Sequence, residues 1–276
     1  MKIYWRKIVI SFSVCLSAAF ILFLWMRFVE PNLLKLEEIS FQSDAFGGKN
    51  LKIIQLSDFH SKKFGENEKD VLEIIKKTNP DFIFLTGDII DWQTENFNDC
   101  FSFWQELTKN RKGIVFGVFG NHEHRNKDFS LAASLMKEAG IEILTNEARK
   151  IIWDNSSFYL IGVDDPHLGF SNLDKALSTV SGGDLRILLA HSPEIFRQAK
   201  YKDIFLTLVG HTHGCQINLP FLCQYIVSLN YDKQYRSGLY LEEGAYLYVN
   251  RGVEETFLPL RFNSLPEATL ITINPE

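Results

Sequence analysis

Five apolar segments of five to seven residues each lead into a side chain that can bind a metal ion. The segments are residues 51–56, 81–85, 113–119, 186–190 and 203–209. Continuous apolar runs of this length are typical of strands that are buried on both faces of a sheet. In open α/β sheets the carboxyl ends of the strands form the ligand crevice. We therefore expect the side chains that follow these segments to converge, although they are spread over some 155 positions.

The sequence between these strands has helical periodicity. Apolar residues spaced three or four apart predict helices over 66–77, 95–109 and 130–139 and near 172–180. A hairpin is expected over 150–163 with its turn at Asp154-Asn155, and further strands are expected near 245–249 and 268–273. The order β-α-β-α-β, followed by a mixed pattern, predicts a layered α/β fold.

Oxygen and imidazole donors stand at the ends of the predicted strands. They are Asp58, His60, Asp88, Asn121, His191, His211 and His213. A mixed set of this kind suits borderline divalent ions such as Mn, Fe or Zn. Seven donors are too many for one such ion, but two ions that share a carboxylate can use them. The pattern therefore indicates a site for two metal ions, and two such ions ~3.5–4 Å apart suit hydrolytic displacement at phosphorus.

The charge of the chain is unevenly distributed. Residues 1–35 carry a balance of +4, which leaves −9 for the rest of a chain whose net charge is −5. An acidic body argues against a nucleic-acid-binding protein, which needs a basic face to neutralise phosphates. It is compatible with a small phosphate ester as substrate, because bound metal ions supply local positive charge.

The four cysteines have no C-x-x-C spacing of zinc or redox sites. They define no redox compartment. We expect Cys215, two residues after His213, to be a buried thiol and not a metal ligand.

Residues 8–26 form an uncharged apolar run of nineteen positions, close to the length that crosses a hydrocarbon core of ~30 Å. A signal peptide cleaved near Ser17-Ala18-Ala19 is the alternative. The apolar run continues past these residues, which favours an uncleaved anchor in the cytoplasmic membrane. We divide the chain into the anchor with its flanks (1–35), a linker (36–50) and one domain (51–276).

The basic residues on the two sides of the apolar run decide its orientation. Lys2, Arg6 and Lys7 precede the run, so the positive-inside rule places the domain outside the cytoplasm. Arg27 and Lys35 follow the run and weaken this bias. A domain on the cytoplasmic side therefore stays open as an alternative.

Five motifs at the strand ends resemble the signature of the calcineurin-like metallophosphoesterases. They are Asp58-x-His60, Gly87-Asp88, Gly120-Asn121-His122-Glu123, His191 and Gly210-His211-x-His213. The tail of the chain resembles the membrane-associated bacterial branch of that superfamily, and the resemblance covers about residues 51–274. Cys215 departs from the pattern, because that branch usually has a second glycine there. The resemblance implies a four-layer α-β-β-α sandwich of two mixed sheets flanked by helices.

The resemblance also implies roles for individual residues. One ion would be held by Asp58, His60 and His213, the other by Asn121, His191 and His211, and Asp88 would bridge the two ions. The ions would be Mn, with Fe, Zn or Mg as alternatives. A metal-bridging hydroxide would attack phosphorus, and His122 would stabilise charge and protonate the leaving oxygen. Supporting or structural roles are left for Glu123, Arg251, Asp164 and Asp165, and surface-loop positions are expected for His124 and His167.

The apolar stretch 221–230, FLCQYIVSLN, bears on the substrate. It either packs in the core or forms an apolar lip that meets lipid beside the site. Together with the anchor, the lip favours an amphiphilic phosphate ester. Some members of the superfamily hydrolyse UDP-2,3-diacylglucosamine in lipid A biosynthesis at the cytoplasmic face, and this is the expected substrate. The alternatives are a general membrane-anchored phosphodiesterase and a catalytically inert, metal-bound membrane scaffold.

Overall fold

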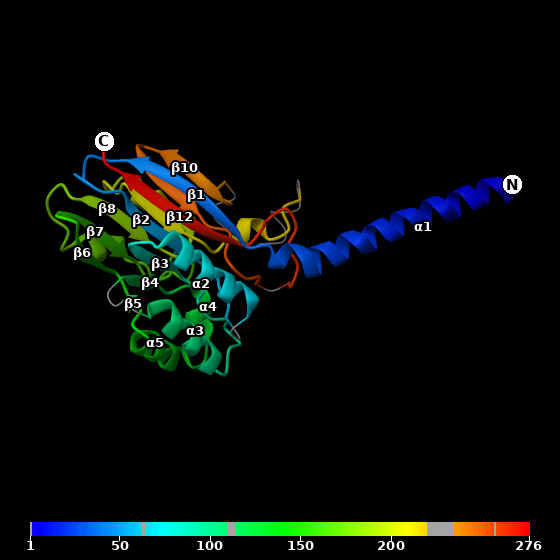
Figure 1. Cartoon of the computed structure of the whole chain (residues 1–276), viewed down its shortest axis with the longest axis horizontal. Coiled ribbons are helices and arrows are strands. Elements are labelled where there is room, and N and C mark those ends of the chain that lie inside the picture. Colours follow the sequence, from blue (N-terminus) through cyan, green and yellow to red (C-terminus); the bar gives the residue numbers. More distant parts are fainter. Residues whose placement is uncertain (1, 62–64, 110–113, 220–233, 257) are drawn as a thin grey trace.

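The structure is a computed structural model of the 276-residue chain, and it describes residues 2–61, 65–109, 114–219, 234–256 and 258–276. A folded body carries one long N-terminal helix that projects away from it (Figure 1). The apolar stretch 221–230 lies outside the described residues.

Two six-stranded mixed sheets form the centre of the body. The first sheet has the order β1 (Lys35–Gln42), β12 (Glu267–Asn274), β2 (Leu51–Leu56), β3 (Phe82–Thr86), β4 (Val115–Val118) and β5 (Glu142–Ile143). The second has the order β10 (Gly238–Glu242), β11 (Ala245–Val249), β9 (Leu206–Val209), β8 (Leu185–Leu189), β7 (Ser156–Gly162) and β6 (Glu147–Trp153). Strands β2, β3 and β4 are mutually parallel, as are β7, β8 and β9, so each set places its carboxyl ends at one edge.

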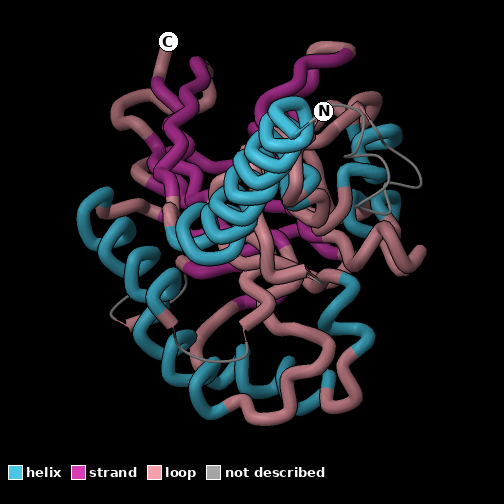
Figure 2. The backbone as a smooth tube through the Cα atoms, turned by 90° about the vertical axis from the view of Figure 1, so that its right-hand side faces the viewer, coloured by secondary structure: helices cyan, strands magenta, loops and turns pink. Residues whose placement is uncertain are grey.

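Helices cover the outer faces of both sheets. Helices α2 (Glu66–Thr78), α3 (Asn98–Thr108) and α5 (Phe129–Glu138) pack on the first sheet, and α6 (Leu173–Leu177) and α7 (Phe196–Ala199) pack on the second. The inner faces meet in an apolar cluster that includes Phe84 and Phe116 of the first sheet and Leu160 and Leu208 of the second. Figure 2 views the molecule from the side of the projecting helix and shows the strands flanked by helices. The predicted four-layer α-β-β-α sandwich is confirmed.

The expected strands and helices are present, with ends shifted by a few residues. The hairpin of β6 and β7 turns at Asp154-Asn155 as predicted, and both turn residues have positive φ. Residues 35–42 form strand β1 at the edge of the first sheet. The sequence pattern places Lys35 in the anchor flank and the rest of this segment in a linker over 36–50. Polar and apolar residues are mixed in this segment because one side of an edge strand faces solvent, so no continuous apolar run marks it.

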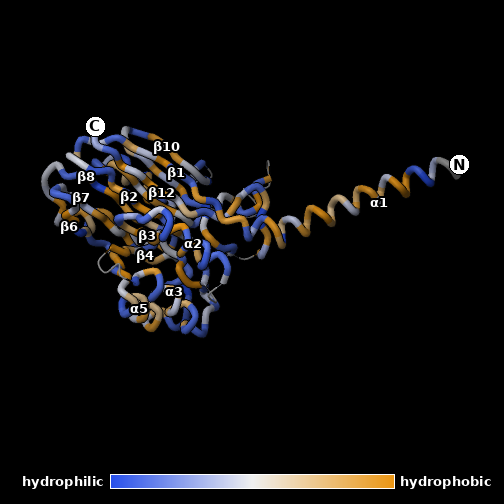
Figure 3. Tube along the Cα trace, viewed as in Figure 1, coloured by the Kyte–Doolittle hydropathy of each residue, from blue (hydrophilic) through white to orange (hydrophobic). Residues whose placement is uncertain are grey.

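The projecting helix α1 (Lys2–Leu24) continues through a π-helical turn (Trp25–Val29) and a 3₁₀ turn (Glu30–Asn32). Residues Tyr4–Asn32 are long and apolar enough to cross a membrane, and their most apolar 18-residue window has a mean hydropathy of 2.5 and is not buried in the body. The apolar colouring of the helix is continuous along most of its length (Figure 3). By length and composition, the helix is a candidate membrane anchor or signal sequence.

Candidate metal centre

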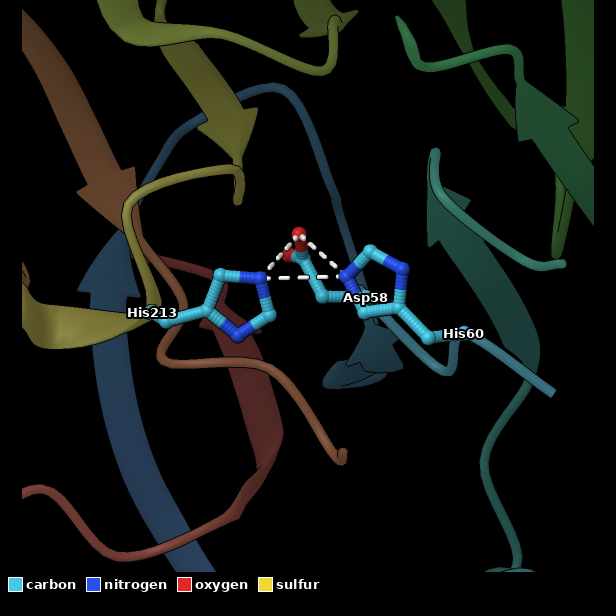
Figure 4. A group of neighbouring side chains, drawn as sticks. All are labelled: Asp58, His60 and His213. Atoms are coloured by element: carbon cyan, nitrogen blue, oxygen red, sulfur yellow. Dashed lines mark hydrogen bonds and ion pairs between the residues drawn. The ribbon is translucent and has the colours of Figure 1, made fainter. Parts of the chain in front are cut away.

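The strand ends of both sheets bring six of the seven predicted ligands together, and Asn121 lies at the start of a helix that follows a strand of the first sheet. Asp58 and His60 follow β2, Asp88 follows β3, Asn121 opens the short helix α4 (Asn121–Arg125), His191 follows β8, and His211 and His213 follow β9. Asp58, His60 and His213 form one group whose ligand atoms lie within 4.8 Å of one another (Figure 4). Asp88, His191 and His211 form a second such group.

Asp88 belongs to the second group and also approaches His60 of the first. Its Oδ2 is 3.2 Å from His191 Nε2 and 3.8 Å from His60 Nε2. In the first group, His213 Nε2 is 3.3 Å from Asp58 Oδ1 and 3.1 Å from His60 Nε2. The closeness of Asp88 to histidines of both groups agrees with the predicted bridging role, which stays a prediction.

The donor set fits divalent cations. Asn121 is 3% exposed, and its Oδ1 is buried without a hydrogen-bond partner among the described residues. Burying an unpaired carbonyl oxygen is unfavourable unless a cation or water pairs with it. His191 Nδ1 lies 2.8 Å from Thr86 O, and His213 Nδ1 lies 3.1 Å from Glu254 O. When Nδ1 carries the proton and donates it to these carbonyls, each Nε2 lone pair is free to bind a metal ion.

The backbone at the centre adopts an unusual conformation. Five of the predicted ligands have positive φ: Asp58 (52°), His60 (42°), Asp88 (49°), His211 (70°) and His213 (49°). Non-glycine residues rarely adopt this conformation, and such strain is concentrated at functional sites. Gly210 allows the approach of β9 to β2, because a Cβ atom there would lie 1.9 Å from Ser57 Oγ and 2.2 Å from Asp58 Oδ2.

Glu123 connects the two loops that carry Asp88 and Asn121. Its buried carboxylate accepts hydrogen bonds from the amides of Asp88 (3.0 Å), Ile90 (2.9 Å) and Gly120 (2.7 Å). Burial and the negative charge of Asp88 raise the pKa of Glu123 to about 7. Glu123 therefore supports the position of Asp88 and does not extend into either group of ligands.

His122 faces two carboxylates. Its amide donates a hydrogen bond to Asp88 Oδ1 at 2.8 Å, and its Nδ1 lies 3.5 Å from Asp91 Oδ2. Burial lowers the pKa of His122, but its hydrogen bond to Asp91 and the charge of Asp88 outweigh burial and raise the pKa above its usual value. A histidine that holds its proton in this way suits a general acid. Asp91 is absent from the sequence-based set, although it is buried and follows Asp88 by only three positions.

The remaining histidines and Arg251 have structural partners. His124 and His167 are partly buried and not freely exposed on surface loops: His124 Nε2 lies 2.6 Å from Asp164 Oδ1, and the His167 ring lies 4.7 Å from the His211 ring. Arg251 is 2.6 Å from Glu267 and also pairs with Glu37, so it connects β12 to β1.

Cys215 is buried and disulfide-bonded. The expectation of a thiol at this position was wrong, because a single sequence does not reveal which cysteines meet in space. The same bond excludes Cys215 as a thiolate metal ligand.

Comparisons with known proteins agree with this geometry. Residues 51–215 match the calcineurin-like phosphoesterase family. The chain is 33% identical over 259 residues to the uncharacterized metallophosphoesterase YkuE of Bacillus subtilis (90% of this chain, 88% of the relative). It is 29% identical over 260 residues to the phosphodiesterase YaeI of Escherichia coli, an alignment that covers 90% of this chain and 92% of the relative. It is 24% identical over 326 residues to the UDP-2,3-diacylglucosamine pyrophosphatase LpxG of Chlamydia muridarum, covering 95% of this chain and 96% of the relative. The chain belongs to the calcineurin-like phosphoesterase family and is a phosphoester hydrolase.

Proposed function

We propose that the chain is a membrane-anchored enzyme that hydrolyses a phosphodiester or pyrophosphate bond with two divalent metal ions. The observation that carries the proposal is the pair of three-residue groups, one of which contains Asp88 and each of which combines residues from both sheets, together with the unpaired Asn121 Oδ1. Asp58, His60 and His213 would hold one ion, and Asn121, His191 and His211 the other, with Asp88 shared. Mn is the first candidate metal, with Fe, Zn or Mg as alternatives.

When bound, two such ions activate water and neutralise the charge that develops on the phosphoryl group. The residues of the chain contribute orientation and proton transfer. His122 would bind the phosphoryl group and donate a proton to the leaving oxygen, while Asp91 holds its imidazole from the Nδ1 side. Glu123 keeps the loops of Asp88 and Asn121 in register through its three amide contacts.

The test of this chemistry is turnover of bis(4-nitrophenyl) phosphate by the full chain in detergent with Mn²⁺. The proposal expects turnover by the wild-type protein and none by Asp88→Ala or His122→Ala. A wild-type protein that is folded, binds Mn²⁺ and remains inert would refute the enzyme and favour the metal-bound membrane scaffold.

The candidate substrate is UDP-2,3-diacylglucosamine, which would make the chain an enzyme of lipid A biosynthesis. Support comes from the similarity to LpxG of Chlamydia muridarum along 95% of this chain and from the apolar helix α1, which suits a lipid-linked substrate. Release of UMP from UDP-2,3-diacylglucosamine, absent in Asp88→Ala, is the expected result. Turnover of a simple diester without release of UMP would refute this substrate.

A second candidate is a general phosphodiesterase that acts outside the cytoplasmic membrane. The disulfide at Cys215 favours it, because disulfides persist in oxidising compartments. The basic residues Lys2, Arg6 and Lys7 before the apolar run favour the same orientation. Digestion of the domain by protease added to intact spheroplasts would support this candidate, and protection of the domain would support the lipid A enzyme.

A further inference from the structure

A cavity of about 400 Å³ has both the candidate ligand His60 and the anchor residue Arg27 in its wall. Glu254, Glu255 and Pro259 also line it. The cavity therefore lies between the candidate metal centre and the end of the helix that would cross the membrane.

The end of the anchor is fixed to the domain by hydrogen bonds. Arg261 donates its amide to Met26 O at 2.9 Å, and Ser264 donates its amide to Glu30 Oε1 at 2.8 Å. Ser264 Oγ in turn donates to the carbonyl of the candidate ligand His213 at 2.7 Å. The position of Arg27 relative to the centre is thus set by the fold. Arg27 also lies in the π-helical turn of residues 25–29, a rare conformation that is frequent at functional sites.

Arg27 has no acidic partner in the described part of the chain. Its guanidinium lies 5.0 Å from the ring of its neighbour Phe28, and no described carboxylate is within salt-bridge distance. Unpaired arginine in a cleft is suited to an anionic ligand, since its planar group binds phosphate oxygens well.

The cavity lies at the expected level of the membrane surface, because Arg27 in its wall directly follows the apolar run 8–26. The apolar side chains of Phe28, Val29, Leu33 and Leu258 are exposed. If residues 8–26 cross the bilayer, Phe28 and Val29 lie at its interface, where exposed apolar groups are stabilised by lipid.

We propose that this cavity binds the polar head of a membrane-resident phosphoester. The lipid chains would stay in the bilayer beside α1, the reacting phosphate would lie at the candidate metal centre, and Arg27 would pair with the anionic ester. The buried Glu255 Oε1 has no hydrogen-bond partner among the described residues, so the head group would donate hydrogen bonds from hydroxyl or amino groups. The inference rests on the proposed phosphoesterase function and adds the substrate class and its route of entry.

The test uses two probes with the same reacting bond, hexadecyl 4-nitrophenyl phosphate and methyl 4-nitrophenyl phosphate. The full chain, loaded with Mn²⁺ in nonionic detergent micelles, is assayed with each probe. The wild-type enzyme is expected to show a kcat/KM at least about tenfold higher for the hexadecyl ester. Arg27→Ala is expected to lower kcat/KM about tenfold for both esters, because both carry the anionic phosphate with which Arg27 would form a charge-assisted hydrogen bond. Arg27→Lys, which keeps the charge, is expected to retain part of this kcat/KM.

Arg6→Ala is the matched control, because Arg6 lies near the other end of α1 and outside the cavity. It is expected to keep the wild-type kcat/KM for both esters. A wild-type hexadecyl-to-methyl ratio near one, or an equal kcat/KM in Arg6→Ala and Arg27→Ala, would overturn the inference while leaving the phosphoesterase intact. Absence of turnover of both esters by the wild-type chain would refute the proposed function and the inference with it.

Discussion

Replacing Asn121 by leucine separates a metal ligand from a structural residue. Asn121 is buried, and its Oδ1 has no hydrogen-bond partner in the described structure. An unpaired buried carbonyl costs about 1–3 kcal/mol, and a leucine of similar size removes that cost while adding at most about 1.5 kcal/mol of repacking strain. Without metal, the stability of Asn121→Leu should therefore lie between about 0.5 kcal/mol below and about 3 kcal/mol above that of the wild type.

With metal bound, Asn121→Leu should gain less stability than the wild type. Changing a residue that only supports a ligand costs 10–100-fold in metal affinity, so loss of a direct ligand should cost at least about 100-fold, or ~2.8 kcal/mol. At a Mn²⁺ concentration of about 100 times the wild-type Kd, metal stabilises the wild type by ~2.7 kcal/mol. The same concentration would stabilise Asn121→Leu by only ~0.4 kcal/mol.

The measurement is urea unfolding of the full chain in detergent micelles, with EDTA and with Mn²⁺, followed by tryptophan fluorescence. Asn126→Leu is the matched control, because Asn126 is equally buried but fully hydrogen-bonded. Its Nδ2 donates to Asp91 O (3.1 Å) and Thr94 O (2.9 Å), and its Oδ1 accepts from the Asp128 amide (2.8 Å). Loss of three hydrogen bonds should destabilise the metal-free control by about 2–4 kcal/mol. The reasoning is refuted if Asn121→Leu destabilises the metal-free protein as much as Asn126→Leu and keeps the wild-type response to Mn²⁺.

Three further predictions concern the centre. His122→Asn should lower kcat by about 10²–10⁴-fold without loss of bound Mn²⁺, and loss of the metal as well would contradict a proton-transfer role. Gly210→Ala should lower both the melting temperature and the Mn²⁺ affinity, because its Cβ would lie 2.2 Å from Asp58 Oδ2; wild-type affinity by calorimetry would contradict this. Burial lowers the pKa of His191, but Asp88 and Asp58 outweigh burial and raise it well above its usual value. Mn²⁺ must displace that proton, so calorimetric Mn²⁺ affinity should increase between about pH 6 and pH 8, and a flat or falling affinity would count against His191 as a ligand.

The inner strands and the candidate ligands could both be predicted from the sequence, because the ligands directly follow the strands. Strands buried on both faces are continuous apolar runs, so their ends are visible, and the residues that converge are those that directly follow them. The convergence of the candidate ligands could therefore be predicted from the order of the strand ends, whereas their division between two ions came from the family resemblance.

Other features depend on contacts between distant residues. Strand β1 pairs with β12 from the opposite end of the chain, with Lys35 opposite Glu267, and nothing local in its mixed sequence marks it as a strand. Asp91 lies in the turn after β3, where no periodicity distinguishes a residue that faces His122 from one that faces solvent. The docking of the anchor through Glu30 and Ser264 joins residues 234 positions apart.

The most direct test of the account is to measure metal content and turnover in one preparation of the full chain. The protein is loaded with Mn²⁺, freed of excess metal, and analysed by elemental analysis and with bis(4-nitrophenyl) phosphate, beside Asp88→Ala. The account predicts about two Mn per wild-type chain with turnover, and fewer than two Mn without turnover in Asp88→Ala. A folded wild-type chain that retains no metal, or an Asp88→Ala chain that turns over the diester as fast as the wild type, would contradict it.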